Sequence, residues 1–366
     1  MSCDYVQLAN PGVQTLQPYQ AGKPTDELER ELGLTEIVKL ASNENPLGPS
    51  PDVLQAIQQA TAELTRYPDS NGYHLKLALS KRFLIDPEQI TLGNGSNDLL
   101  ELVARTFLRE GVESIYSQYG FIVYPLVTKA TGARGIEIQA NHYAHDLDAI
   151  AKAVTDKTRV IFLANPNNPT GTYFSTDAFS AFMQKIPSSV IVVLDEAYSE
   201  YATHLNLPNG LDWVNHYTNL VVTRTFSKAY GLASLRVGFA VANKEITDLL
   251  NRVRQPFNVS GLAQVAAVAT LGDQEYLSRT IDANTYGYQQ LANGFDELNI
   301  DYIESAANFL TINLQQDALP IYQQLLKMGV IVRPLGVYGM PNHLRVSIGT
   351  DLENKHLLMA LKKVRV

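Results

Sequence analysis

Cysteine is almost absent from this chain: Cys3 is the single example among 366 residues and has no second cysteine to pair with. The sequence therefore excludes an internal disulfide framework and a metal site built from several cysteines. Apolar runs are too short to span a bilayer. The first residues lack a basic segment followed by an apolar run, so we expect no signal peptide and a cytoplasmic location.

Basic residues are also fewer than acidic ones, with 29 Lys and Arg against 37 Asp and Glu, which gives a formal net charge of −8. This balance disfavours nucleic acid and anionic membranes as partners. The seven histidines include no pair at ligand spacing on a helical pattern, and we interpret His142 and His145 as surface residues. The sequence therefore predicts no metal site.

The apolar runs that do occur alternate with helical patterns, which is typical of an α/β fold. Proline and glycine punctuate residues 1–40, which we interpret as an irregular arm. Strands are expected at 90–92, 114–116, 135–138, 160–163, 190–194, 220–223 and 237–242. Helical patterns between them, for example at 98–109, 147–154 and 176–185, predict a sheet that is covered on both faces.

The pattern changes after Asn251. A long helical stretch begins near Leu262, and the remainder predicts strands at 309–314, 330–332 and 344–348 and helices at 318–328 and 352–364. We therefore expect three parts: an N-terminal arm at 1–40, a large α/β domain at 41–255, and a smaller α+β domain at 256–366.

Lys228 follows the apolar run 220–223, and Arg236 comes eight positions later. An amine at the end of a strand, with a cation in reach, suits Schiff-base chemistry on an anionic carbonyl cofactor. Pyridoxal 5'-phosphate (PLP) is such a cofactor, and it requires a lysine, an anchor for its phosphate and an acid at its ring nitrogen. The alternative is that Lys228 is a solvated surface lysine.

Two further polar groups follow buried runs. Asp195 comes directly after 190–194, where its carboxylate could hold a pyridinium nitrogen protonated or could cap a helix. Asn168 lies in a turn with two Asn-Pro steps that ends at Gly171, which is either a rigid platform for an amide or an ordinary loop.

A glycine-rich turn at 93–97 separates a predicted strand from a predicted helix, which favours an anion at the start of that helix. Tyr119 follows another strand and could stack on a flat ring. Arg333 and Arg345 lie at or within apolar runs of the C-terminal part, where each needs a bidentate anion or an internal salt bridge.

These motifs occur in the same order in a known family. The chain resembles the fold-type I PLP-dependent aminotransferases, and among them the histidinol-phosphate aminotransferases. The matching segments are 40–48, 66–69, 92–96, 165–171, 195–198, 225–231 with Arg236, 254–259 and 344–347. The resemblance implies a mostly parallel seven-stranded sheet with helices on both faces, followed by a smaller α+β C-terminal domain.

The resemblance also implies roles for individual residues toward PLP. Lys228 would bind the cofactor covalently, Asp195 would pair with its ring nitrogen, and Tyr119 would stack on the ring. Asn168 and Tyr198 would contact the phenolic oxygen. The phosphate would be held by Gly95, Ser96, Asn97, Thr225, Ser227 and Arg236, and by Tyr67 of a neighbouring subunit in a homodimer. Relatives often carry an acid at the position of Asn97, where this chain has an amide that can still donate to phosphate.

The activity implied by the resemblance is reversible transamination of L-histidinol phosphate with 2-oxoglutarate, which gives imidazole acetol phosphate and L-glutamate in histidine biosynthesis. Tyr19, Asn43, Arg333 and Arg345 would line the substrate pocket. An aromatic or broad-specificity amino acid aminotransferase on the same fold is the alternative. A PLP-dependent decarboxylase and a non-catalytic PLP-binding regulator are further alternatives, although the chain has no basic DNA-binding segment.

Overall fold

The computed structural model describes residues 3–18, 22–34 and 36–364 of the chain. Its centre is a sheet of seven strands in the order β2-β8-β7-β6-β5-β3-β4. The strands are β2 (Ile90–Gly93), β3 (Glu113–Ser117), β4 (Arg134–Ile138), β5 (Thr158–Ala164), β6 (Ile191–Asp195), β7 (Leu220–Thr225) and β8 (Gly238–Val241). β8 pairs antiparallel with β2 and β7, whereas the other neighbours are parallel. The predicted mostly parallel sheet is confirmed.

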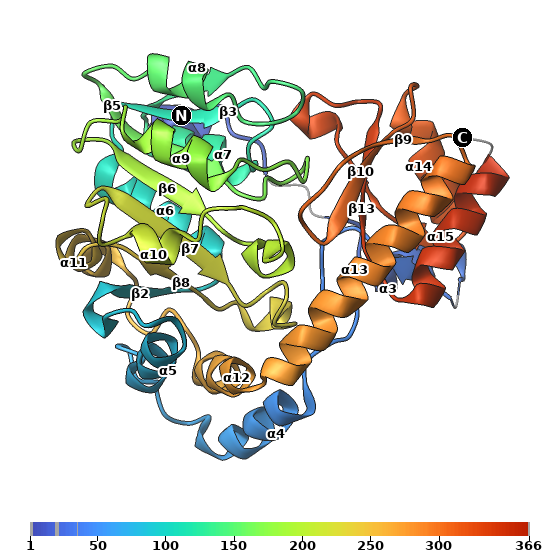
Figure 1. Cartoon of the computed structure of the whole chain (residues 1–366), viewed down its shortest axis with the longest axis horizontal. Coiled ribbons are helices and arrows are strands. Elements are labelled where there is room, and N and C mark those ends of the chain that lie inside the picture. Colours follow the sequence, from blue (N-terminus) through green and yellow to red (C-terminus); the bar gives the residue numbers. More distant parts are fainter. Residues whose placement is uncertain (1–2, 19–21, 35, 365–366) are drawn as a thin grey trace.

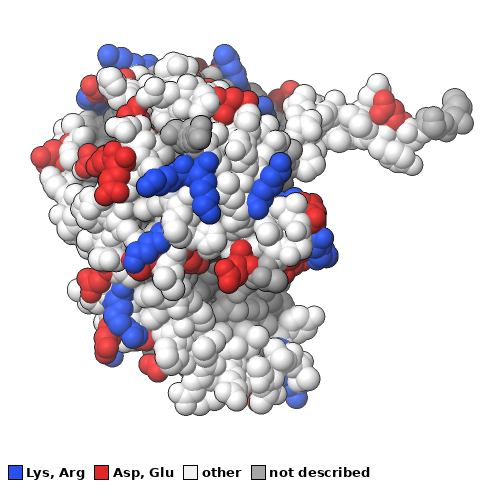
Figure 2. Space-filling view, turned by 90° about the vertical axis from the view of Figure 1, so that its right-hand side faces the viewer, with Lys and Arg blue, Asp and Glu red and all other residues white. Residues whose placement is uncertain are grey.

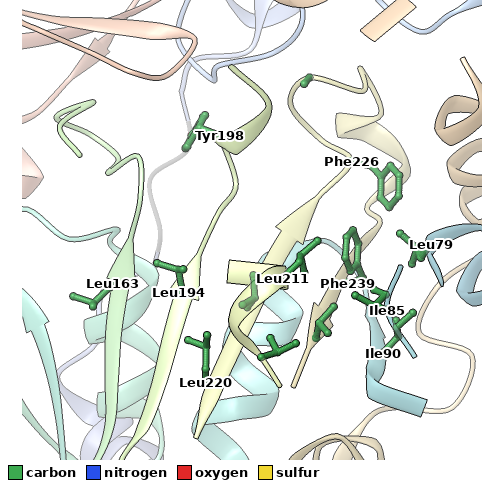
Figure 3. Close-up of a cluster of buried hydrophobic side chains, with 14 of the residues drawn as sticks. Leu79, Ile85, Ile90, Leu163, Leu194, Tyr198, Leu211, Leu220, Phe226 and Phe239 are labelled. Carbon is green, nitrogen blue, oxygen red and sulfur yellow. The ribbon is translucent and has the colours of Figure 1, made fainter. Parts of the chain in front are cut away.

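The central strands β5, β6 and β7 are largely apolar because both of their faces are buried. In β6, Val192 and Leu194 belong to one hydrophobic cluster, while Ile191 and Val193 belong to another on the opposite face. This alternation follows from the two-residue repeat of a strand. Figure 3 shows part of the first cluster, with Tyr198 beyond the end of the sheet.

Helices cover both faces, as expected from the sequence. Members of α5 (Tyr73–Phe83), α8 (Leu147–Lys152), α9 (Thr176–Met183) and α12 (Gly261–Gly272) join the first cluster. Members of α6 (Ser96–Phe107), α7 (Val123–Ala130) and α11 (Lys244–Val253) join the second. The remaining helical elements of this part are α4 (Pro51–Ala60), α10 (Gly210–Trp213), η1 (Thr61–Glu63), η2 (Pro87–Gln89), η3 (Ser199–Ala202) and η4 (Ala233–Leu235).

A second, smaller sheet is antiparallel and has the order β12-β13-β10-β9. It comprises β9 (Asp301–Ile303), β10 (Phe309–Asn313), β12 (Arg333–Pro334) and β13 (His343–Ser347), with α13 (Gln274–Glu297), α14 (Ala318–Lys327), α15 (Asp351–Val364) and η5 (Gly336–Tyr338) around it. In Figure 1, α13 runs from beside α12 to this smaller sheet. α12 itself packs on α4 and α5. The domain limits at 40 and 255 stay a prediction.

The described residues among the first 40 are more regular than the sequence suggested. They form α1 (Tyr5–Leu8), α2 (Pro11–Gln14), α3 (Thr25–Leu32) and β1 (Val38–Lys39), and β1 pairs with β11 (Val330–Ile331). The punctuating residues mark helix ends: Pro11 begins α2, Pro24 precedes α3, and Gly33 ends α3 with a φ of 67°. The prediction of an irregular arm was therefore wrong. These proline and glycine residues lie at the ends of helices, where they are compatible with helix formation.

The surface carries both signs of charge. Figure 2 shows acidic and basic side chains interspersed on one face of the molecule. Within residues 3–18, 22–34 and 36–364, no helix has the length and apolar character needed to cross a membrane.

A buried ion pair links β7 to the segment after β6. Arg224 donates from Nε and Nη2 to Glu196 Oε2 at 2.9 and 2.8 Å, and both side chains are buried. Arg224→Met leaves the carboxylate unpaired, so we expect the free energy of unfolding to fall by about 3–5 kcal/mol in chemical denaturation. The exposed pair Arg252–Asp248 on α11 is the control, since Arg252→Met should cost about 0–1 kcal/mol. Equal losses would contradict the prediction.

Candidate active site

A cavity of about 180 Å³ lies where strands β5, β6 and β7 end and where the smaller sheet approaches the larger one. We call it the sheet-edge cavity. Ligands of open α/β sheets collect at this edge because the polar ends of parallel strands converge there. Most of the predicted site residues line it: Asn43, Ser96, Asn97, Asn168, Asp195, Tyr198, Thr225, Ser227, Lys228, Arg236, Arg333 and Arg345.

Lys228 reaches this cavity from the turn after β7. Its Nζ donates to the Ser42 carbonyl at 2.9 Å and lies 5.7 Å from the centre of the Tyr198 ring. Burial lowers the pKa of this amine to about 7, and the positive charges of Arg345 and Arg236 act in the same direction. Lys228 is therefore a partly buried amine that can lose its proton near neutral pH, and the surface-lysine interpretation is wrong.

Asp195 ends β6 and is 4% exposed. Its Oδ2 accepts from the Tyr124 hydroxyl at 3.0 Å and its Oδ1 from Thr223 Oγ1 at 3.1 Å. Burial raises the pKa of this carboxyl to about 6, against the opposing effect of these donors. The alternative reading of Asp195 as a helix cap is wrong, because the next helical turn, η3, begins only at Ser199.

Two separate side-chain hydrogen bonds link residues that line the cavity. Asn43, with a φ of 55°, donates from Nδ2 to Tyr198 Oη at 3.0 Å. Arg345 in β13 donates to Asn168 Oδ1 and, at 2.7 Å, to the Ala41 carbonyl. Each of these side-chain bonds therefore pairs a residue expected near the cofactor with one expected near the substrate.

Hydrogen-bond donors gather in the cavity at the start of α6. We call Ser96, Ser227 and Arg236 the anion cradle. Gly95 precedes α6 with a φ of 78°, and within the described part of the chain no side chain caps that helix. Arg236, which has a φ of 54°, donates to Ser227 Oγ at 3.1 Å. A Cβ atom at Gly95 would displace the Arg236 guanidinium, and the positive φ of this residue independently favours glycine.

This cradle fits the phosphate of PLP. A helix N-terminus with free N–H groups and an adjacent guanidinium is a strong site for a dianion. Hydroxyl groups of Ser96, Thr225 and Ser227 line the same cavity. Lysine, buried carboxylate and anion cradle therefore occur together, as the chemistry of this cofactor requires.

Four predicted residues do not line the sheet-edge cavity or lie outside the described ranges, and one of them is Gly95, which precedes α6. The Tyr119 ring lies 5.7 Å from that of Tyr143, its carbonyl accepts from Asn167 Nδ2, and Phe121 lines the cavity instead. Tyr67 is 82% exposed and stacks on Phe257. Tyr19 falls outside the residues that the structure describes.

The structure also adds residues that the sequence did not indicate. Tyr338, from η5, lines the cavity, and Tyr124 and Thr223 contact Asp195 from outside it. His145, interpreted as a surface residue, is partly buried and its Nε2 lies 3.0 Å from the Ala164 carbonyl. In the described ranges no group of three or more His, Cys, Asp or Glu could hold a metal ion.

Comparison with known proteins agrees with this geometry. Residues 35–361 match the family model for aminotransferase class I and II. Histidinol-phosphate aminotransferase 2 of Pseudomonas aeruginosa is 55% identical over 99% of this chain and 98% of its own length. Histidinol-phosphate aminotransferase 1 of Idiomarina loihiensis is 54% identical, with 98% of each chain covered.

A solved structure is also similar. The crystal structure of histidinol-phosphate aminotransferase from Sinorhizobium meliloti in complex with pyridoxal-5'-phosphate has a TM-score of 0.90 and 30% identity, and the match covers 97% of this chain and 96% of that one. The chain therefore belongs to the class I and II aminotransferase family. The relatives that it matches over nearly its full length are named as histidinol-phosphate aminotransferases, so the predicted resemblance is confirmed.

Proposed function

We propose that this protein binds PLP in the sheet-edge cavity and catalyses the reversible transamination of L-histidinol phosphate with 2-oxoglutarate, giving imidazole acetol phosphate and L-glutamate in histidine biosynthesis. One observation carries the chemistry: a partly buried lysine of lowered pKa and a buried acid line the same cavity as an anion cradle. Identity of 55% to a protein named for this substrate supports the choice of amino donor.

PLP, when bound, supplies an electron sink that stabilises negative charge at the substrate carbon. The residues that would hold its phosphate are Ser96, Ser227 and Arg236, and Asp195 would hold a proton on its ring nitrogen. Lys228 Nζ would hold the cofactor through its aldehyde group and would serve as the base that takes or returns a proton at the substrate carbon. A pKa of about 7 allows both forms of this amine at neutral pH.

Substrate anions would meet the arginines of the smaller sheet. Arg333 and Arg345 are register partners on β12 and β13, and both line the cavity. A guanidinium fork accepts a phosphate or a carboxylate, so the same pair can serve histidinol phosphate and glutamate in turn. The two arginines therefore support a phosphorylated donor and a dicarboxylate acceptor equally.

The substrate assignment can be tested by titrating the PLP-loaded protein in parallel with histidinol phosphate, phenylalanine and glutamate and following the visible absorption of the cofactor. Rapid loss of the starting band at far lower histidinol phosphate than phenylalanine supports the proposal. An equal or better response to phenylalanine makes the protein an aromatic aminotransferase. Release of carbon dioxide indicates a decarboxylase, and no response to any amine indicates a regulator.

The lowered pKa of Lys228 has a consequence for the rate of cofactor capture. Reaction of the apo-protein with PLP should accelerate as pH rises through about 7, where the amine becomes neutral, and become constant above that. Arg345→Gln removes a cation that lowers this pKa. The midpoint of the pH profile for the reaction with PLP should therefore lie at higher pH in this variant. Stopped-flow absorbance measures both profiles, with Arg252→Gln on the exposed face of α11 as the control. A midpoint that moves to lower pH in Arg345→Gln would refute the cause assigned here.

A homodimer is part of the proposal. Tyr67 is exposed and stacks on Phe257, so its hydroxyl is available to a second chain. Large apolar side chains of α1, namely Tyr5, Val6 and Leu8, are exposed as well. Exposed apolar side chains of this size are typical of a surface that is covered by a partner. A cytoplasmic location for this dimer stays a prediction.

Mixing two inactive variants tests whether Tyr67 acts across the dimer. Lys228→Ala and Tyr67→Ala chains should each be deficient alone, but co-refolded mixtures should regain turnover. One site of each mixed dimer then combines an intact Lys228 with an intact Tyr67 from the other chain. Native mass spectrometry confirms that mixed dimers form. Mixed dimers without recovered turnover would show that Tyr67 does not complete the partner's site.

A further inference from the structure

Asp195 is held from outside the sheet-edge cavity by two hydroxyl groups that lie on different elements. Tyr124, on α7, donates to Oδ2 at 3.0 Å, and Thr223, on β7, donates to Oδ1 at 3.1 Å. Asp195 lines the cavity, whereas Tyr124 and Thr223 do not. Each carboxylate oxygen therefore receives a donor from outside the cavity before any ligand enters.

Tyr124 is fixed in place by its own packing. Its side chain is fully buried, and its ring lies parallel to that of Phe162, with centres 5.0 Å apart and an interplanar angle of 6°. Its carbonyl accepts from Thr128 Oγ1 at 2.8 Å, and that hydroxyl lies 2.7 Å from Ser114 Oγ on β3. The direction of the Tyr124 hydroxyl is thus set by the core and is independent of the cavity.

Burial and the charge of Asp195 raise the pKa of Tyr124 well above its usual value, so the hydroxyl keeps its proton and acts as a donor. Two other titratable groups near Asp195 have interactions of the opposite kind. Glu196, next in the chain, raises the pKa of Asp195, and the buried Tyr198 has its own pKa raised in part by Asp195. Tyr124 and Thr223 are therefore the side chains that favour the carboxylate form.

We propose that Tyr124 is a positioning residue whose hydroxyl, together with that of Thr223, keeps Asp195 ionised and oriented, and so determines how strongly Asp195 binds a protonated ring nitrogen. This inference rests on the proposed binding of PLP. Without the two donors, a carboxyl in this apolar setting would take up a proton itself and could no longer pair with a pyridinium. Tyr124 touches neither cofactor nor substrate in this account and acts only through Asp195.

Tyr124→Phe is the direct test, because phenylalanine keeps the stacked ring and removes only the donor. A hydrogen bond to a charged group supports an expected loss in kcat and in PLP affinity on the order of tenfold. Loss of a donor to the charged form raises the pKa of Asp195, so the acid limb of the kcat profile should move to higher pH by about one unit. Thr223→Val removes the second donor and should shift the profile in the same direction.

Tyr116→Phe is the matched control, since the Tyr116 hydroxyl is buried against Gly135 and has no bond to Asp195. Its pH profile should be that of the wild type. A readout that needs no cofactor is the infrared absorption of the protonated Asp195 carboxyl in the apo-protein, assigned with Asp195→Asn. This band should persist to higher pH in Tyr124→Phe and in Thr223→Val than in Tyr116→Phe.

The outcomes separate this inference from the proposed function. Wild-type protein that transaminates, with Tyr124→Phe and Thr223→Val sharing its pH profile and its carboxyl band, overturns the positioning role alone. Wild-type protein that does not bind PLP overturns the proposed function, and the infrared titration then still decides whether Tyr124 controls Asp195. A shifted band together with a shifted kcat profile supports both.

Discussion

Lys228→Ala is expected to abolish transamination while the protein still binds PLP. The amine is the group in the sheet-edge cavity that can bond to the aldehyde and also move a proton at the substrate carbon, and alanine can do neither. General base catalysis alone contributes about 10²- to 10⁴-fold, so we expect turnover to fall by at least about 10⁴-fold. Steady-state assays with histidinol phosphate and 2-oxoglutarate measure the loss.

PLP should remain bound to this variant because the anion cradle of Ser96, Ser227 and Arg236 is untouched. Gel filtration followed by absorbance measures retained cofactor. Lys185→Ala is the control, since that lysine forms an exposed pair with Asp148 and should leave turnover unchanged. Turnover of Lys228→Ala at the wild-type level would refute the assignment of Lys228.

The sequence located the central strands β5, β6 and β7 because both of their faces are buried and they are therefore largely apolar. Polar residues directly after such runs lie at one edge when the strands are parallel. This rule is sufficient to bring Lys228, Asp195 and Asn168 into one cavity. The antiparallel direction of β8 has no signal of this kind, because its run is as apolar as the others.

Residues whose place depends on long-range packing could not be found from the sequence. Tyr124 is one of 19 tyrosines, and its hydroxyl reaches Asp195 only because the ring packs on Phe162. Tyr338 enters the cavity from η5, between two strands of the smaller sheet. The pairing of β1 with β11 joins residues almost 300 positions apart, and no local pattern indicates it.

Tyr119 illustrates how a motif can indicate a segment without placing its side chain. The resemblance implied that the Tyr119 ring stacks on the cofactor, yet the chain turns at Gly120 and Phe121 lines the cavity. The Tyr119 carbonyl meanwhile accepts from Asn167, which ties this turn to the Asn-Pro turn. The segment is at the site, and the stacking role of Tyr119 stays a prediction.

Asp195→Asn is expected to have the second-largest effect on activity. Asparagine keeps the shape of the side chain but cannot carry the charge that pairs with a protonated ring nitrogen. Removing one partner of a buried ion pair costs about 3–5 kcal/mol. If the transition state loses this much stabilisation, the rate falls by about two to four orders of magnitude. Single-turnover absorbance changes with histidinol phosphate measure the rate.

Glu113→Gln serves as the control for Asp195→Asn. Glu113 is also a buried acid, but it begins β3 at the opposite edge of the sheet and pairs with Arg134 and Thr155. Its substitution should leave the single-turnover rate unchanged. The amide in Asp195→Asn cannot titrate, so the acid limb near pH 6 that the raised pKa of Asp195 predicts should also disappear. An Asn variant that keeps both that limb and the wild-type rate would show that another group protonates the ring nitrogen.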